Sequence, residues 1–184
     1  RRRSLSPAAA RAAAFSAVHR LWSLPCPARA RRLALYLPAD GELDCTPLAV
    51  QAWRRGRQVF LPVITGETLR FAPFHSRSEM RANRFGIAEP VTPRRNWRTA
   101  HELDVIVAPL VAFDFQGRRL GMGGGFYDRT LAFLMRGSRG RRPHFIALAS
   151  EIQKIAVLPS EAWAVPTAPA VPEFWMTYVV TEAC

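Results

Sequence analysis

The sequence contains almost no lysine and few acidic residues. Lys154 is the single lysine among 26 basic residues, and 14 acidic residues leave a formal charge of +12. This excludes the phosphate-binding P-loop, which needs a lysine directly after its last glycine. The excess charge is carried almost wholly by arginine and indicates affinity for polyanions, but it does not discriminate among nucleic acid, acidic membranes and polyphosphate ligands.

Cysteine and long apolar runs are also scarce. Cys26, Cys45 and Cys184 are odd in number and show neither CxxC nor Cys/His spacing, so no disulfide framework or structural zinc site is expected. Reduced thiols of this kind indicate a cytoplasmic location. No apolar run approaches the ~20 residues that cross a bilayer, so no membrane partner is expected.

The four histidines offer no metal site either. His19, His75, His101 and His144 lie in unrelated settings, without a second histidine or acid at ligand spacing. The chain also lacks a G-x-S-x-G elbow and a Cys/His pair for covalent catalysis. Its length of 184 residues suffices for one core, and we expect a single domain over residues 1–184.

Helical and extended patterns alternate along the chain. The expected helices cover residues 7–22, 46–55 and 126–136, and the expected strands cover residues 33–37, 58–64, 105–108, 145–149 and 178–181. Residues 69–74 alternate and predict a small β-hairpin arm, whereas residues 76–93 give no clear pattern. The order predicts an α/β fold, with a mostly parallel sheet covered by helices on both faces in an open, Rossmann-like αβα sandwich.

Residues 108–129, which read APLVAFDFQGRRLGMGGGFYDR, are the most informative stretch. Four glycines fall among the five residues 121–125, just before the expected helix. Such a loop can turn its N–H groups inward and bind an anion at the positive end of the helix dipole. A dinucleotide fingerprint is excluded because Phe126 stands where its third glycine should be.

Two interpretations of this loop remain open on residue pattern alone. It could be a surface hairpin without a ligand, because glycine motifs of this kind are weak. The neighbouring Arg118, Arg119, Tyr127 and Asp128 favour a phosphate site instead, since cations, a phenol and a carboxylate suit a metal-bound triphosphate.

The motif resembles the signature of a known enzyme family. Its parts are Ala112-Phe113-Asp114, Arg119-Leu120-Gly121, Gly123-Gly124-Gly125 and Tyr127-Asp128-Arg129. In this order and spacing they are similar to the signature of the 5-formyltetrahydrofolate cyclo-ligase (methenyltetrahydrofolate synthetase) family. Weaker similarities cover residues 36–42, Gln153, Leu158-Pro159 with Glu161, and residues 179–182.

The resemblance implies an ATP- and Mg²⁺-dependent ligase of one-carbon metabolism. Such an enzyme cyclises 5-formyltetrahydrofolate, free or polyglutamylated, to 5,10-methenyltetrahydrofolate and releases ADP and phosphate. The implied catalytic residues are Arg119, Tyr127 and Asp128, of which Asp128 would bind Mg²⁺. The residues implied for ATP are Arg119, Gly121, Met122, Gly123, Gly124, Gly125, Phe126 and Tyr127, and those for the folate are Leu37, Glu42, Met122, Gly123, Gly124, Gly125 and Phe126.

Two of these acids also have structural interpretations. Glu42 could favour the dipole of the helix that begins near Thr46, and only the resemblance makes it a folate contact. Asp114 is expected to be structural, because Asx residues commonly close turns.

The departures from the family support other functions. Ala164 and Thr177 occupy the best-matching places for two family acids, and the basic residues of the family's first helix would lie ahead of Arg1. One alternative is therefore a degenerate relative that binds nucleotide or folate without turnover. Another is an RNA-binding protein driven by the +12 charge, although no RNA-binding motif is present and nucleic acid is not an expected partner. A monomer is expected.

Overall fold

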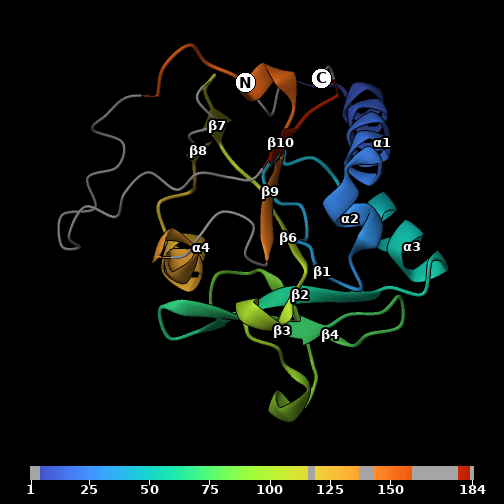
Figure 1. The fold of residues 1–184 in the computed structure, drawn as a ribbon, viewed down its shortest axis with the longest axis vertical. Coiled ribbons are helices and arrows are strands. Elements are labelled where there is room, and N and C mark those ends of the chain that lie inside the picture. The colour runs from blue at the N-terminus through green and yellow to red at the C-terminus, as the bar shows by residue number, and fades with distance from the viewer. Residues whose placement is uncertain (1–4, 116–118, 137–142, 159–177, 183–184) are drawn as a thin grey trace.

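A six-stranded sheet forms the centre of the described structure (Figure 1). The computed structural model describes residues 5–115, 119–136, 143–158 and 178–182. The strand order is β10-β9-β6-β1-β2-β3, and every neighbouring pair is parallel except β2 and β3. The strands are β1 (Arg32–Ala34), β2 (Gln58–Thr65), β3 (Thr68–Pro73), β6 (Val105–Ala108), β9 (His144–Leu148) and β10 (Tyr178–Val180). The expected mostly parallel sheet is confirmed.

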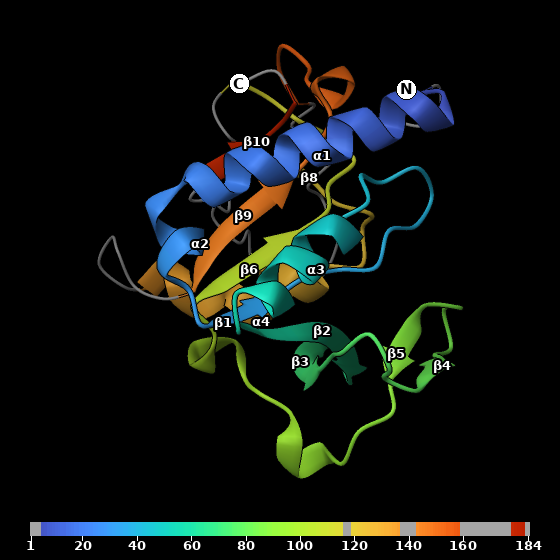
Figure 2. The same cartoon turned by 90° about the vertical axis from the view of Figure 1, so that its right-hand side faces the viewer.

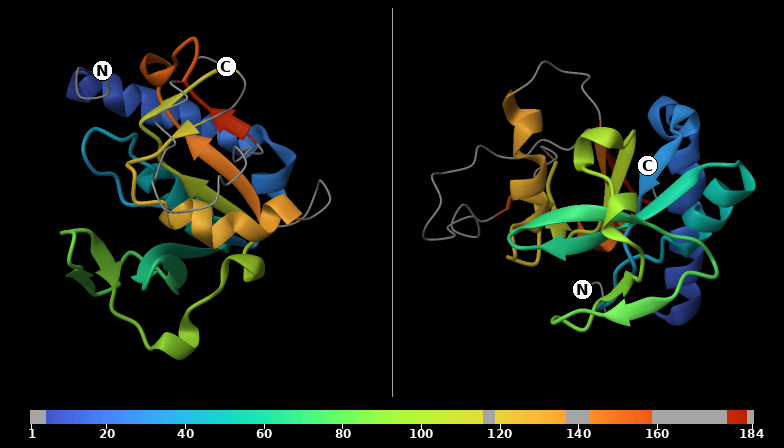
Figure 3. Two further views of the ribbon diagram at one scale, coloured as in Figure 1. Left: turned by 90° about the vertical axis from the view of Figure 1, so that its left-hand side faces the viewer. Right: turned by 90° about the horizontal axis from the view of Figure 1, so that it is seen from below.

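Helices cover both faces of this sheet. One face carries α1 (Pro7–Ser23), α2 (Pro25–Arg29) and α3 (Thr46–Arg54), whereas α4 (Phe126–Leu131) lies across the other (Figures 1 and 3). The helix predicted over residues 126–136 changes after Leu131 into the 3-10 helix η4 (Ala132–Arg136). No helix in the described ranges is long and apolar enough to span a bilayer.

Local sequence explains why α1 begins where it does. The Ser6 hydroxyl accepts a hydrogen bond from the Ala9 N–H at 3.2 Å, and proline occupies the first helical position. The apolar side of α1 is buried against the sheet through small and branched residues such as Ala17, Val18 and Leu21. On the opposite face, Leu131 of α4 belongs to a second buried cluster with Phe71, Ile106 and Phe145.

The hairpin arm expected over residues 69–74 is instead an integral part of the main sheet. β3 pairs with β2 from Phe60↔Pro73 to Thr65↔Thr68 and forms the edge strand. Alternation is also the pattern of an edge strand, so it could not show to which sheet the segment belongs.

A separate small hairpin lies in the stretch that had no clear pattern. β4 (Met80–Ala82) pairs with β5 (Ala88–Pro90). The Asn83 side chain closes its turn by accepting the N–H groups of Phe85 and Ile87 at 2.9 and 3.1 Å. Strands of only three residues give too little pattern for detection by periodicity.

Candidate functional site

The candidate site lies where the parallel strands end. Because β1, β6 and β9 are parallel neighbours, the segments that follow them emerge at one edge of the sheet. The loop after β1 carries Leu37 and Glu42, and the segment after β6 carries the glycine-rich signature. The loop after β1 and the β4–β5 hairpin both lie on this side of the molecule (Figure 2).

Arg119 is buried beside Asp128. Two short antiparallel strands, β7 (Ala112–Phe113) and β8 (Arg119–Leu120), form a hairpin that leaves Arg119 only 5% exposed. Its guanidinium lies 5.1 Å from the centre of the Phe145 ring and donates a hydrogen bond from Nη2 to Asp128 Oδ1. Arg119 Nε is buried and has no hydrogen-bond partner within the described residues. A buried cation with a spare donor is suited to an anionic ligand.

The loop requires glycine for two different reasons, backbone conformation and close neighbours. Gly123 and Gly125 have φ of +84° and +60°, a conformation that side chains rarely adopt. Gly124 does not have a positive φ; there, a Cβ atom would lie 3.0 Å from the Phe126 ring. At Gly125 a Cβ atom would lie 2.6 Å from Arg129 Nη1.

Arg129 links this loop to the sheet through hydrogen bonds. Its Nη2 donates to the Gly124 carbonyl at 2.7 Å, and its Nε donates to the Glu67 carbonyl, in the turn between β2 and β3, at 2.8 Å. Because α4 has only six residues, its dipole is a weak source of anion affinity. The cations and loop N–H groups therefore account for most of the phosphate affinity that the site could have.

Gly124→Val is expected to weaken ATP binding about tenfold with a small loss of stability. The side chain would push the Phe126 ring and the loop N–H groups out of place, because a Cβ atom already meets the ring at 3.0 Å. Isothermal titration calorimetry would measure ATP affinity, and thermal unfolding would monitor the fold. Unchanged ATP affinity would contradict a binding role for this loop.

Glu42 lies within electrostatic reach of Tyr127, although the two residues follow different strands. Desolvation raises the pKa of Tyr127; the Arg119 charge opposes this rise, and the Glu42 charge adds to it. Glu42 Oε2 accepts the Ala39 N–H at 3.0 Å, within its own loop. Asp44, nearer to the start of α3, accepts the Thr46 N–H with its Oδ1 at 2.8 Å.

The loop that carries Glu42 is fixed by two buried side chains. The Tyr36 hydroxyl donates to the Leu43 carbonyl at 2.6 Å, and the Cys45 thiol donates to the Tyr36 carbonyl at 2.7 Å. Burial raises the pKa of Cys45 to about 12 and that of Tyr36 well above its usual value, so both remain donors near neutral pH. Cys26 and Cys45 are free thiols, whereas Cys184 lies outside the described residues.

The raised pKa of Cys45 predicts a loss of stability in alkali. Above pH ~9 the unfolded thiol ionises while the folded thiol keeps its proton, so the free energy of unfolding should fall by up to ~1.4 kcal/mol per pH unit until pH ~12. Cys45→Ser retains a donor that does not titrate and should flatten this slope. Urea unfolding between pH 8 and 10.5 would measure it, and identical slopes would contradict the assignment.

The remaining predicted site residues differ in exposure. Leu37 and Phe126 are half-buried, Met122 is 69% exposed, and the Tyr127 ring lies 6.0 Å from that of Phe145. Asp114 is buried and accepts the Leu158 N–H at 3.5 Å, consistent with the structural role expected for it. Arg118, Ala164, Thr177 and residues 1–4 lie outside the described ranges.

Comparisons with known proteins show the family of the chain. The model of the 5-formyltetrahydrofolate cyclo-ligase family matches residues 1–173. The chain belongs to this family. It is 40% identical over 169 residues to the 5-formyltetrahydrofolate cyclo-ligase of Escherichia coli K12, with 90% of this chain and 91% of the relative covered. The corresponding enzyme of Haemophilus influenzae is 41% identical over 143 residues, which cover 75% of this chain and 73% of the relative.

Solved structures of the family share the fold. The 5,10-methenyltetrahydrofolate synthetase of Aquifex aeolicus superposes with a TM-score of 0.78 at 30% identity, covering 100% of this chain and 84% of its own. A synthetase from Mycoplasma pneumoniae superposes with a TM-score of 0.67, covering 98% and 92%. At 19% identity, the second match supports the fold alone. The expected fold and family are thereby confirmed.

The structure adds one residue to the cyclo-ligase signature region that the sequence did not reveal. Phe85, in the β4–β5 turn, is 54% exposed, and its ring meets that of Phe126 edge-on at 6.1 Å. Arg84 stacks over Phe85 at 4.8 Å. The turn residues Asn83 and Gly86 could have indicated the hairpin, but nothing in the sequence indicated its proximity to the signature.

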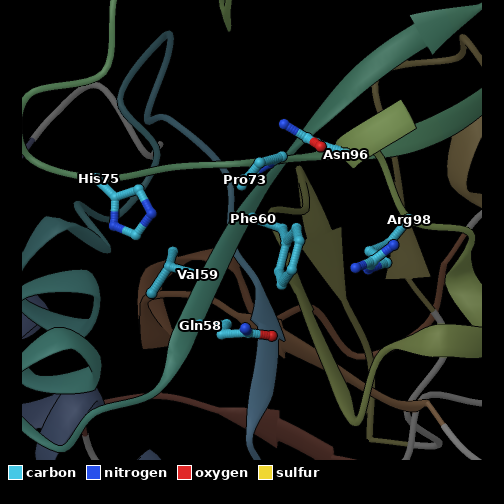
Figure 4. A pocket seen from close by; sticks show the side chains of 7 residues that line it. All are labelled: Gln58, Val59, Phe60, Pro73, His75, Asn96 and Arg98. Atoms are coloured by element: carbon cyan, nitrogen blue, oxygen red, sulfur yellow. The ribbon is translucent and has the colours of Figure 1, made fainter. Parts of the chain in front are cut away.

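A cavity of about 230 Å³ lies away from the cyclo-ligase signature (Figure 4). It lies at the start of β2, whereas the candidate site lies where the parallel strands end. Its lining includes Gln58, Phe60, Pro73, His75, Asn96 and Arg98. Because none of the predicted site residues takes part, this cavity is distinct from the candidate site.

Among the described residues of the signature loop, Asp128 has a carboxylate that is exposed enough to bind a metal ion. Its side chain is 41% exposed, although it also accepts a hydrogen bond from Arg119. Within the described ranges, no group of three or more His, Cys, Asp or Glu side chains could enclose a metal ion. This donor set fits Mg²⁺, which needs few protein ligands when phosphate oxygens and water complete its shell.

Proposed function

We propose that this chain catalyses the ATP-dependent cyclisation of 5-formyltetrahydrofolate to 5,10-methenyltetrahydrofolate, with release of ADP and phosphate. It is thus a ligase that forms a C–N bond, as its family relatives are named. The observation that carries the proposal is the buried Arg119, which has an unpartnered Nε, donates from Nη2 to Asp128 and lies against Gly121 of the signature. Such a constellation suits a triphosphate better than it suits a surface turn.

The proposed chemistry requires charge neutralisation more than covalent catalysis. A formyl oxygen is a poor leaving group, and ATP supplies the phosphoryl group that makes it a good one. Arg119 and the N–H groups of residues 121–125 would hold the triphosphate, and the neutral Tyr127 hydroxyl would donate to a phosphate oxygen. Glu42, Leu37 and the exposed Met122 would bind the folate, so that both reactants are held together.

We further propose that Asp128 holds Mg²⁺. When bound, Mg²⁺ neutralises the charge of the triphosphate and of the departing phosphate. Asp128 would hold the metal, and Arg119 would hold the nucleotide beside it. We also infer a single domain, a monomer and a cytoplasmic location. Polyglutamylated folate would be an acceptable substrate, because so basic a protein attracts its carboxylates.

An absorbance assay for methenyltetrahydrofolate tests the proposed function. Purified protein is expected to form product only when 5-formyltetrahydrofolate, ATP and Mg²⁺ are all present. ATP binding without any turnover would favour the degenerate relative, in which the losses at Ala164 and Thr177 abolish activity. Absence of both binding and turnover would refute the proposal.

A further inference from the structure

We propose that Gln153 is the positioning residue that holds Arg119 in place for the nucleotide. This inference rests on the proposed function. Gln153 lies in the 3-10 helix η5 (Glu151–Gln153), directly after β9, and is only 4% exposed. Its Nε2 donates to the Leu110 carbonyl at 2.6 Å and to the Val111 carbonyl at 3.2 Å.

These contacts fix the point at which the chain enters the signature hairpin. The Val111 N–H donates to the Leu120 carbonyl at 2.7 Å, and Phe113 pairs with Arg119. A ladder with two residues in each strand cannot hold its own register. The position of Arg119 therefore depends on external supports.

A second support comes from the same segment. The Ile155 N–H donates to the Phe113 carbonyl at 2.9 Å, on the strand that pairs with Arg119. Residues 153–155 thus form hydrogen bonds both with the residues just before β7 and with its last residue, Phe113. A displaced β7 would carry β8 with it and move the guanidinium away from Phe145 and Asp128.

The support itself is firmly anchored. Gln153 Oε1 accepts the Ser150 N–H at 2.8 Å, which closes a capping box with the Ser150 side chain. The Ser150 hydroxyl also donates to Glu182 Oε1 at 2.6 Å, immediately after β10. The carboxamide of Gln153 therefore links a platform built on β9 and β10 to the hairpin that carries Arg119.

Glutamine suits this position because two carbonyls and one N–H face it. Methionine has a similar length but provides neither donor nor acceptor. Glutamate keeps the acceptor for Ser150 but directs an anion at the carbonyls of Leu110 and Val111. Gln153→Met therefore removes both the donor and the acceptor, whereas Gln153→Glu removes the donor alone.

A double-mutant cycle on ATP affinity tests the proposal without requiring turnover. Gln153→Met is expected to weaken ATP binding about tenfold in calorimetric titrations. In an Arg119→Ala background the same change should cost less than about twofold, because the residue through which it acts is absent. Equal losses in both backgrounds, or no loss from Gln153→Met alone, would overturn the proposal.

Gln153→Glu gives a second measurement and serves if Gln153→Met does not fold. The ratio of its ATP affinity to that of the wild type, measured at each pH, should rise toward one as the pH falls. The reason is that a protonated carboxyl can donate to the Leu110 carbonyl again. A pH-independent ratio would contradict the role of the donor. Trp53→Phe is the matched control, since it removes a donor to the Phe74 carbonyl at 3.1 Å elsewhere in the fold and should leave ATP affinity within about twofold.

The outcome is separable from that of the proposed function. Lack of turnover by the wild-type protein would count against the cyclo-ligase activity and would leave the ATP-binding cycle interpretable. Additive losses in the cycle would count against Gln153 alone.

Discussion

Asp128→Asn is expected to lower kcat at least about 100-fold, the usual range for removing one electrostatic contact to a reacting group. The amide has the same shape as the carboxylate but is a poor Mg²⁺ ligand, so the phosphate charges would remain uncompensated. Arg119 would also lose its anionic partner, and the charge of that buried guanidinium would be less well compensated. Because Asp128 is 41% exposed, we expect a stability loss of only about 1–2 kcal/mol and a retained fold.

Steady-state rates at several Mg²⁺ concentrations would test this expectation. Glu79→Gln, which neutralises an exposed acid on the segment before β4, is the matched control and should retain the wild-type kcat. A wild-type rate for Asp128→Asn at limiting Mg²⁺ would exclude Asp128 as the metal ligand. A low rate accompanied by unfolding would show a structural role instead, so circular dichroism belongs beside the kinetics.

Local signals predicted most of the fold because they act over a few residues. The cap at Ser6 begins α1, and the apolar run Val105–Ala108 is β6 with the expected bounds. The strand expected over residues 33–37 ends at Ala34, since the chain leaves the ladder there. The edge strand β3 and the β4–β5 hairpin were less predictable, although both pairings are local in sequence. Alternation does not show which sheet a strand joins, and strands of three residues give too little pattern.

In the candidate site, backbone conformation could be predicted from the sequence better than side-chain contacts could. The spacing in the signature indicated a phosphate loop, and glycines at 123 and 125 do adopt a positive φ. Gly124 differs from these two, because the Phe126 ring and not the backbone conformation requires glycine there. The Arg119–Asp128 pair could not be read from sequence, because it depends on how the β7–β8 hairpin folds back toward α4.

Arg119→Ala should weaken ATP binding far more than removal of a surface arginine, and the comparison decides between specific recognition and general basic charge. With a charge of +12, any polyanion experiences a long-range attraction to which every exposed arginine contributes a little. Arg95, exposed in the 3-10 helix η2 (Arg94–Asn96), is such a residue. Arg119 differs because it is 5% exposed and holds a buried, unpartnered Nε.

Both substitutions remove one positive charge, so the net charge of the two variants is the same. Loss of hydrogen bonds from a buried guanidinium should cost on the order of 1.5–3 kcal/mol, whereas Arg95→Ala should cost almost nothing. We therefore expect ATP affinities that differ by at least about tenfold, equivalent to ~1.4 kcal/mol, in calorimetric titrations at physiological ionic strength. Raising the salt concentration should shrink the small effect of Arg95→Ala and leave most of the Arg119→Ala effect, because screening acts mainly on exposed charges. Equal losses for the two variants, both fading with salt, would mean that overall charge attracts the nucleotide and would favour the polyanion-binding alternative.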